Sequence, residues 1–309
     1  MNKKIKTFTI IGMFLLTSIM SISVTGIETK SNLKMTGTTI DVYPEDGSNP
    51  IQDAIDQSSD GDTIFIHSGT YNIGREIGDI YKALIIKRPI NGLKIIGQDP
   101  IKTIINAHGA DVITVDSPGI ENIEISHLTI RSLEKDPDIY GVYGINVVVG
   151  DNIKIHNNII DSCAIGFYFQ GNQQRYPERL RIANNEFTHV GYKGLYLQFL
   201  NEPYVYGNTI NSDLLGMSLI TCLGSSRVLA NQIYSTLDYG LYINNSAASS
   251  ESRGLIANNR LIVTGNSESN ALYITNTKHY DVVYNSVNTS SLRTASKALT
   301  IKTVFRRGE

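Results

Sequence analysis

Tyrosine and amide side chains recur at alternate positions of short apolar segments, where together they could bind a sugar. The segments that carry them are GFYFQG (166–171), GLYLQF (194–199), GLYINN (240–245) and ALYITN (271–276). A tyrosine offers an apolar ring and a hydroxyl, and a glutamine amide can both donate and accept hydrogen bonds toward sugar hydroxyls. The predicted substrate-binding residues are Tyr168, Gln170, Tyr196, Gln198, Tyr242 and Tyr273. The alternative is that these tyrosines only stack on one another and stabilise a sheet.

A second group of residues is charged and lies in or beside the connecting segments. LEKDPDIYGVY (133–143) and GNQQRYPER (171–179) carry carboxylates and arginine, and a lysine precedes the second tyrosine segment. Such groups could serve as acid and base on a sugar chain. The candidate catalytic residues, expected around Tyr168, are Asp136, Asp138, Arg175, Glu178 and Lys193. The alternative is that these charges are solvated and have no catalytic role.

A column of asparagines indicates which repeating elements position these residues. Six short motifs place one asparagine each in a common register, between apolar neighbours. The aligned residues are Asn158, Asn185, Asn208, Asn231, Asn259 and Asn285, separated by 27, 23, 23, 28 and 26 residues. A repeat of this period indicates a solenoid. Asparagine is unfavourable in strands, so we expect its amide to bond to the next coil at a turn.

The segments between the asparagines alternate apolar and polar residues with period two. They read GINVVV (144–149), GFYFQG, GLYLQF, GMSLIT (216–221), GLYINN, ALYITN and ALTIKT (298–303). This alternation predicts strands with one buried face. Two or three short strands in each repeat predict a parallel β-solenoid, in which each coil is buried against its neighbours.

The repeats, together with the entry segments 51–72 and 84–106, resemble the right-handed parallel β-helix group of the pectin-lyase-like superfamily. The resemblance implies an all-β, single-stranded, right-handed parallel β-helix over about residues 38–303, with a short N-terminal capping helix. The residues agree: Pro50 suits the first turn of a helix, Ile51, Ala54 and Ile55 form an apolar stripe, and Thr63–Ile66 follows as a strand.

The same resemblance places a substrate cleft on the outer face of the first sheet, which the glycine-starting strands would form. The two outward columns that we read on this sheet contain no Asp or Glu. The pattern thus departs from that of pectin-degrading hydrolases, which need paired carboxylates, and of calcium-dependent lyases, which need acidic ligands. Whether the protein is an enzyme is therefore left open. We expect no cofactor, with calcium only in the case of a lyase.

The ends of the chain indicate export. Three lysines precede an apolar run from Phe8 to Val24, which predicts a signal peptide over 1–26, a linker over 27–37 and the β-helix domain over 38–309. We therefore expect a secreted protein, extracellular or at the cell surface, without a membrane span after signal removal. ALTIKT is followed by no polar cap, so we expect the C-terminus to be truncated or covered by a partner.

The charge of the chain and the placement of its cysteines and histidines give no support for nucleic-acid binding, a disulfide or a metal site. A formal net charge of −2 gives no electrostatic case for nucleic acid. Cys163 and Cys222 lie two coils apart, which disfavours a disulfide. Some secreted β-helix proteins are described as copper-binding, but the histidines here share no register and have no Met or Cys partners, so we predict no metal site.

The sequence thus predicts a β-helix that recognises extracellular or cell-surface polysaccharide. One alternative is a polysaccharide lyase, epimerase or glycoside hydrolase with a site carried by loops. A second alternative is a structural surface or adhesion module in which the solenoid acts as a spacer.

Overall fold

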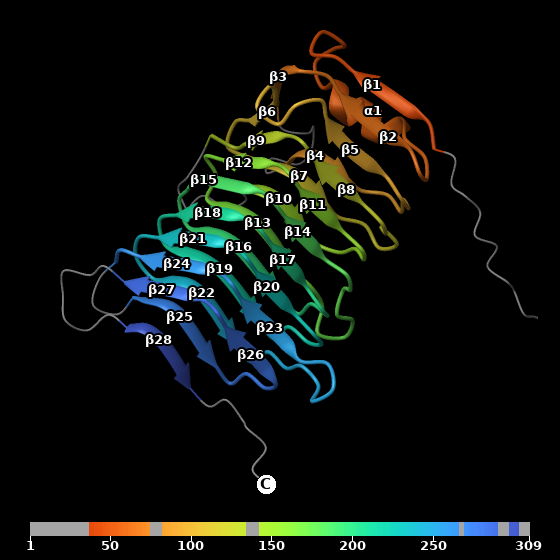
Figure 1. Ribbon diagram of the computed structural model, residues 1–309. Coiled ribbons are helices and arrows are strands. Elements are labelled where there is room, and N and C mark those ends of the chain that lie inside the picture. Colours follow the sequence, from red (N-terminus) through yellow and green to blue (C-terminus); the bar gives the residue numbers. More distant parts are fainter. Residues whose placement is uncertain (1–36, 75–81, 134–141, 266–268, 290–296, 303–309) are drawn as a thin grey trace, which may run out of the picture. The chain divides into compact units, whose positions relative to one another are not determined.

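The chain forms a parallel β-solenoid (Figure 1). The structure is a computed structural model, and it describes residues 37–74, 82–133, 142–265, 269–289 and 297–302. These residues form one helix and three sheets in which each strand pairs in parallel with a strand of the next coil. Crossovers between parallel strands are right-handed in nearly all proteins. The predicted all-β fold, a right-handed parallel β-helix, is confirmed.

Each coil contributes one strand to each sheet. The nine-stranded first sheet contains β4 (Lys82–Ile86), β7 (Asp111–Val115), β10 (Tyr143–Val147), β13 (Ile165–Gln170), β16 (Lys193–Gln198), β19 (Leu215–Ile220), β22 (Tyr239–Asn244), β25 (Asn270–Thr275) and β28 (Lys297–Lys302). The ten-stranded second sheet contains β1 (Thr39–Val42), β2 (Thr63–Ile66), β5 (Lys94–Gly97), β8 (Glu124–Ser126), β11 (Lys154–His156), β14 (Arg181–Ala183), β17 (Tyr204–Tyr206), β20 (Arg227–Leu229), β23 (Gly254–Ala257) and β26 (Tyr280–Val283). The nine-stranded third sheet contains β3 (Gly69–Ile73), β6 (Thr103–Ala107), β9 (Thr129–Arg131), β12 (Ile159–Asp161), β15 (Glu186–Val190), β18 (Thr209–Ser212), β21 (Gln232–Ser235), β24 (Arg260–Val263) and β27 (Ser286–Thr289).

The core is built from the inward positions of these strands, as the alternation predicts. Ile145, Phe167, Leu195, Met217 and Leu241 stand in one register and are all fully buried. Apolar burial of this kind is the main favourable contribution to folding. The outward residues of the same strands therefore form one continuous surface, which is where a site could lie.

A helix closes the first sheet at its N-terminal end. Helix α1 (Pro50–Gln57) starts at Pro50 and buries Ile51 and Ile55, as predicted. Its Gln52 is also buried, and the Gln52 amide donates to the Ile85 carbonyl over 3.0 Å and accepts from the Ile85 N–H over 2.8 Å. The side chain thus makes the two hydrogen bonds that a neighbouring strand would make to β4. This explains how the helix caps a sheet edge without leaving a buried polar group unpaired.

The asparagine column runs along the turn between the second and third sheets. Asn158, Asn185, Asn208 and Asn231 are buried. The Nδ2 and backbone N–H of each donate to Oδ1 of the next asparagine, for example from Asn185 to Asn208 over 3.0 and 2.9 Å. At the head of the column Leu128 takes the asparagine position, and its N–H donates to Asn158 Oδ1 over 3.1 Å. The predicted hydrogen-bonded column is confirmed.

A column of small residues lies at the start of the first-sheet strands. A Cβ added at Gly194 would stand 2.3 Å from Cγ2 of Ile210 and 2.5 Å from the carbonyl oxygen of Gly216. A Cβ at Gly240 would stand 2.6 Å from the carbonyl oxygen of Ala271, but its nearest side chain, Val263, would be 3.3 Å away. Ala271 occupies the same register one coil later. Glycine thus lets the corner between the third and first sheets pack closely.

Several sequence-based boundaries fall outside the described residues. These are the signal peptide over 1–26, all but the last residue of the linker over 27–37, and the C-terminal residues 303–309. Within the described ranges, no helix has the length and apolar character needed to cross a bilayer. Cys163 and Cys222 are buried and are not joined by a disulfide.

Candidate functional site

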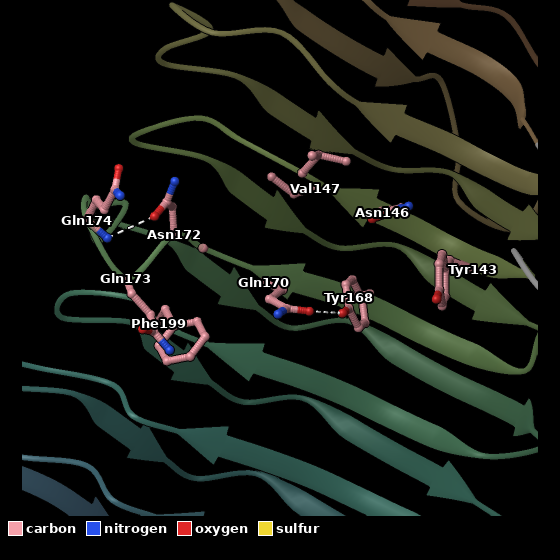
Figure 2. A pocket seen from close by; sticks show the side chains of 11 residues that line it. Tyr143, Asn146, Val147, Tyr168, Gln170, Asn172, Gln173, Gln174 and Phe199 are labelled. Carbon is pink, nitrogen blue, oxygen red and sulfur yellow. Dashed lines mark hydrogen bonds between the residues drawn. The ribbon is translucent and has the colours of Figure 1, made fainter.

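A groove of about 650 Å³ lies on the outer face of the first sheet, over β10 and β13 (Figure 2). Tyrosines and an asparagine of the strands form one part of it, and the loop after β13 forms the other. The residues that line it are Tyr143, Asn146, Val147, Val148, Tyr168, Gln170, Gly171, Asn172, Gln173, Gln174 and Phe199. None of these side chains is charged, and five of them carry an amide. The groove therefore presents hydrogen-bond donors and acceptors beside aromatic rings.

The predicted tyrosine column is real, but it is divided into two clusters. Tyr168 and Tyr196 are in register, and their rings stack 5.0 Å apart with an interplanar angle of 5°. Ser218 interrupts the column in the next coil and is buried. Tyr242 and Tyr273 then stack 5.6 Å apart. The first cluster borders the groove through Tyr168, whereas the second cluster does not line it.

The stacking decides which part of each ring can meet a ligand. Tyr168 stacks on Tyr143 on one side and on Tyr196 on the other, so both faces of its ring are covered. The Tyr196 hydroxyl donates to Gln198 Oε1 over 2.6 Å, and the Tyr168 hydroxyl donates to Gln170 Oε1. Each predicted Tyr–Gln pair is thus one hydrogen-bonded unit. Burial, with smaller contributions from neighbouring groups, raises the pKa of Tyr196 to about 12, so the hydroxyl is a neutral donor at pH 7.

Lys193 stands on the first sheet itself, in register with Ile165 of β13. Its Nζ lies 4.6 Å from the ring centre of Tyr196 and 4.8 Å from that of Tyr192. Burial lowers the pKa of Lys193, and the charge of Asp238 partly offsets this effect. The ammonium group is therefore held by two aromatic rings and does not line the groove.

Arg175 and Glu178 lie beyond the other end of the strand, in the loop after β13. Arg175 pairs with Asp151, and the Glu178 N–H donates to Asp151 Oδ1 over 2.8 Å. Arg175 and Asp151 line a second hollow of about 310 Å³, which shares Gln170 and Asn172 with the groove.

The three predicted catalytic residues that the structure describes are thus not brought together around Tyr168. Lys193 lies at the start of a first-sheet strand, whereas Arg175 and Glu178 follow the end of one. Asp136 and Asp138 lie outside the described residues. A catalytic role for any of the five stays a prediction.

The sequence reading missed a third outward column, one position before the column of small residues. It contains Asp111 of β7 and Tyr143 of β10. Tyr143 stacks on Tyr168 at 5.0 Å although it is in register with Ile165, so the two rings meet diagonally. Asp111 is buried, and its carboxylate accepts hydrogen bonds from Asn146 Nδ2 over 2.9 Å and from the Tyr143 N–H over 3.1 Å. The strands of the first sheet thus carry one carboxylate, that of Asp111, which holds the side chain of Asn146 in place by a hydrogen bond.

Two histidines approach each other on the second sheet, although they share no register. The rings of His127 and His156 are 5.9 Å apart, edge to face. The diagonal offset of one residue between neighbouring coils explains why a column-by-column reading overlooked them. Over the residues that the structure describes, no group of three or more His, Cys, Asp and Glu residues could hold a metal ion.

Several solved structures of β-helix enzymes are similar to the chain at low identity. A pectin methylesterase from Erwinia chrysanthemi is 14% identical over 74% of this chain and 80% of its own, with a TM-score of 0.32. A variant of an alginate lyase of family PL6 is 13% identical over 82% of this chain and 37% of its own, with a TM-score of 0.38. The A-module of a mannuronan C-5 epimerase from Azotobacter vinelandii is 13% identical over 83% and 95%, with a TM-score of 0.29. No curated protein sequence matches the chain significantly.

A family model matches residues 55–298, which is most of the β-solenoid. Its description is "Periplasmic copper-binding protein (NosD)". The match and the architecture confirm that the chain is a parallel β-helix repeat protein of the pectin-lyase-like kind. On this evidence, the chain belongs to the NosD family.

Proposed function

We propose that the protein is exported and binds a carbohydrate in the groove over β10 and β13. The observation that carries this proposal is the composition of the groove, in which five amides face an open space bordered by tyrosines. Amides donate and accept at once, as sugar hydroxyls do. The alternation of donors and acceptors along a glycan would therefore find partners without a charged residue in the lining.

Two observations support the proposal that the protein is exported. The family is described as periplasmic, and the sequence begins with a basic stretch and an apolar run typical of a signal peptide. An extracellular or periplasmic location would bring the groove into contact with cell-wall or environmental polysaccharide.

The groove geometry favours recognition of an uncharged stretch of glycan by its hydroxyl groups. The Tyr168 ring is stacked on both faces and its hydroxyl donates to Gln170, so Tyr168 offers no free ring face for stacking on a sugar. The loop amides, such as Asn172 and Gln174, lie beyond the end of β13, past Gln170 (Figure 2). A chain of neutral sugars lying across the strand residues and the loop would contact both groups of amides.

A glycan array with the purified protein would identify a ligand, and three variants would locate it. Tyr168→Ala and Gln174→Ala should each weaken binding by about 1–2 kcal/mol, which is about tenfold. Tyr273→Ala is the matched control, because it removes an equivalent ring from the cluster that does not line the groove, and it should leave binding unchanged. Equal loss in all three variants, or no binding to any glycan, would contradict the proposal.

The same variants separate the binding role from a structural or catalytic one. If the tyrosines only stabilise the sheet, Tyr168→Ala should lower the melting temperature as much as Tyr273→Ala does, with no ligand lost. Incubation with uronate polymers and calcium tests the enzyme alternative. Appearance of unsaturated products would favour a lyase and direct attention to Arg175 and Lys193.

A further inference from the structure

We propose that the hollow beside the groove is a subsite for the acetamido group of an N-acetylated sugar. The inference rests on the proposed carbohydrate binding in the groove and names a substituent that the sugar carries. The hollow has a volume of about 310 Å³ and shares part of its lining with the groove. Figure 2 shows Gln170 between Tyr168 and the loop, and the residues that line both spaces are Val148, Gln170, Gly171 and Asn172. A sugar bound over Gln170 could therefore extend one substituent into the hollow.

The hollow is formed by three successive turns of the β-solenoid, and most of its wall is apolar. Ile120 follows β7, Val148 follows β10 and Pro177 lies in the loop after β13. Ile120 and Pro177 are buried, whereas Val148 is 45% exposed. A water molecule occupies about 30 Å³ of the liquid, so the hollow has room for a group larger than a hydroxyl. A methyl group placed against Val148 would remove apolar surface from water, which favours binding.

One strong hydrogen-bond donor, the side chain of Arg175, lines this apolar hollow. The Arg175 backbone N–H donates to the Asn172 carbonyl over 3.1 Å, and the guanidinium donates to the Asp151 carboxylate. Asp151 is itself held in place, because its Oδ1 accepts from the Glu178 N–H over 2.8 Å. Among the described residues, Asp151 is the only hydrogen-bond partner of the guanidinium. Further N–H groups of Arg175 can therefore donate to an oxygen of a ligand.

The charges of the lining select a neutral substituent. Two carboxylates, those of Glu121 and Asp151, line the hollow with one guanidinium, so a uronate carboxylate would meet an excess of negative charge. A sugar ammonium would lie beside Arg175 and would find both oxygens of Asp151 already hydrogen-bonded. A hydroxyl would leave the apolar wall uncovered. An acetamido group matches the hollow, because its carbonyl oxygen would accept from Arg175 while its methyl covers Val148.

Binding of three matched hexasaccharides to the full chain tests the proposal without any substitution. Cellohexaose, N-acetylchitohexaose and its de-N-acetylated form share one β-linked backbone and carry a hydroxyl, an acetamido and an ammonium group at the same carbon. Isothermal titration calorimetry should show that the acetylated form binds at least about tenfold more tightly than the other two, because a buried methyl and a hydrogen bond from a charged donor both contribute. Equal affinities, or no binding of the acetylated form, would overturn the acetamido subsite. Only failure of every glycan on the array would contradict the proposed function as well.

Arg175→Met tests whether the preference arises at the hollow. The Arg175 side chain is 67% exposed, so the substitution removes the guanidinium with little effect on folding. Affinity for N-acetylchitohexaose should fall at least about fivefold, and affinity for cellohexaose should stay the same, because Arg175 does not line the groove. Arg227→Met removes an exposed arginine of β20 on the second sheet and is the matched control, which should change neither affinity. An unchanged preference in Arg175→Met, or an equal loss in Arg227→Met, would overturn the proposal.

Discussion

At the scale of single residues, the asparagine column shows a direction that its sequence pattern does not. Every bond runs from the N–H and Nδ2 of one asparagine to Oδ1 of the next, and Asn208 Nδ2 also donates to the Ile182 carbonyl over 3.0 Å. Loss of one member therefore affects its two neighbours unequally. The preceding asparagine loses the Oδ1 atom to which it donates. The following asparagine still accepts a hydrogen bond from the backbone N–H of the substituted residue, just as Asn158 accepts one from the N–H of Leu128.

Asn208→Leu should therefore destabilise the protein mainly through Asn185. The Asn185 N–H and Nδ2 would lose Oδ1, and the Ile182 carbonyl would lose its donor. Each buried polar group left without a partner costs about 1–3 kcal/mol, so we expect unfolding in urea to show a loss of about 3–5 kcal/mol. Asn211→Leu, on an exposed position of β18, is the control and should change stability by less than about 0.5 kcal/mol. Equal stability of the two variants would show that the column contributes nothing.

The site residues were predictable only where they follow a column. Tyr168 and Gln170 were found because outward residues recur with period two, and the structure places both in the groove. Tyr143 was missed because its ring reaches Tyr168 diagonally. The loop amides Asn172 and Gln174 have no repeat to reveal them, since their positions depend on the path of the loop.

At the scale of elements, strand register was readable from sequence because each coil repeats the same constraint. The pairing of Leu195 with Met217 and of Tyr196 with Ser218 follows the predicted alignment. The cap was less predictable in detail. The apolar stripe of α1 indicates a buried helix, but no periodic pattern shows that Gln52 replaces a strand by bonding to Ile85.

The corner between the third and first sheets can be tested through its glycines. Gly194→Ala should destabilise by about 1–3 kcal/mol, because the added methyl meets Ile210 at 2.3 Å in a packed core. A methyl group added at Gly240 meets the Ala271 carbonyl oxygen at 2.6 Å, but its nearest side chain, Val263, stands at 3.3 Å, so we expect Gly240→Ala to cost less stability than Gly194→Ala. Denaturant melts of the two variants make the comparison. A larger loss in Gly240→Ala would contradict this account of the corner.

At the scale of the whole β-solenoid, the outward tyrosines make stability sensitive to alkali. Burial raises the pKa of Tyr143 and Tyr196 to about 12, whereas an unfolded tyrosine has a pKa of about 10. Between these values the unfolded chain loses protons that the folded chain keeps. The free energy of unfolding should therefore fall as pH rises from about 10 to 12, and the tyrosine contribution should be fully present below about pH 10.

Lys193 has the opposite effect on the free energy of unfolding, and it acts at lower pH than the tyrosines. Because burial lowers its pKa in the folded state, the unfolded chain holds more protons up to about pH 10.5, and stability rises with pH there. Urea unfolding at several pH values above about 10.5 should therefore isolate the tyrosines. Tyr196→Phe keeps the ring and should flatten the slope, while an identical slope in this variant would show that Tyr196 does not cause it.

The parallel pairing of every strand with the next coil also has a mechanical consequence. Because the bonds between coils run along the stacking direction, a force that pulls the two ends of the β-solenoid apart loads one coil boundary at a time. Successive asparagines are 23 to 28 residues apart, so each peeled coil would release about 80–100 Å of extended chain. Such a protein would unfold one coil at a time, so that its length increases in similar steps and the work of pulling is dissipated gradually.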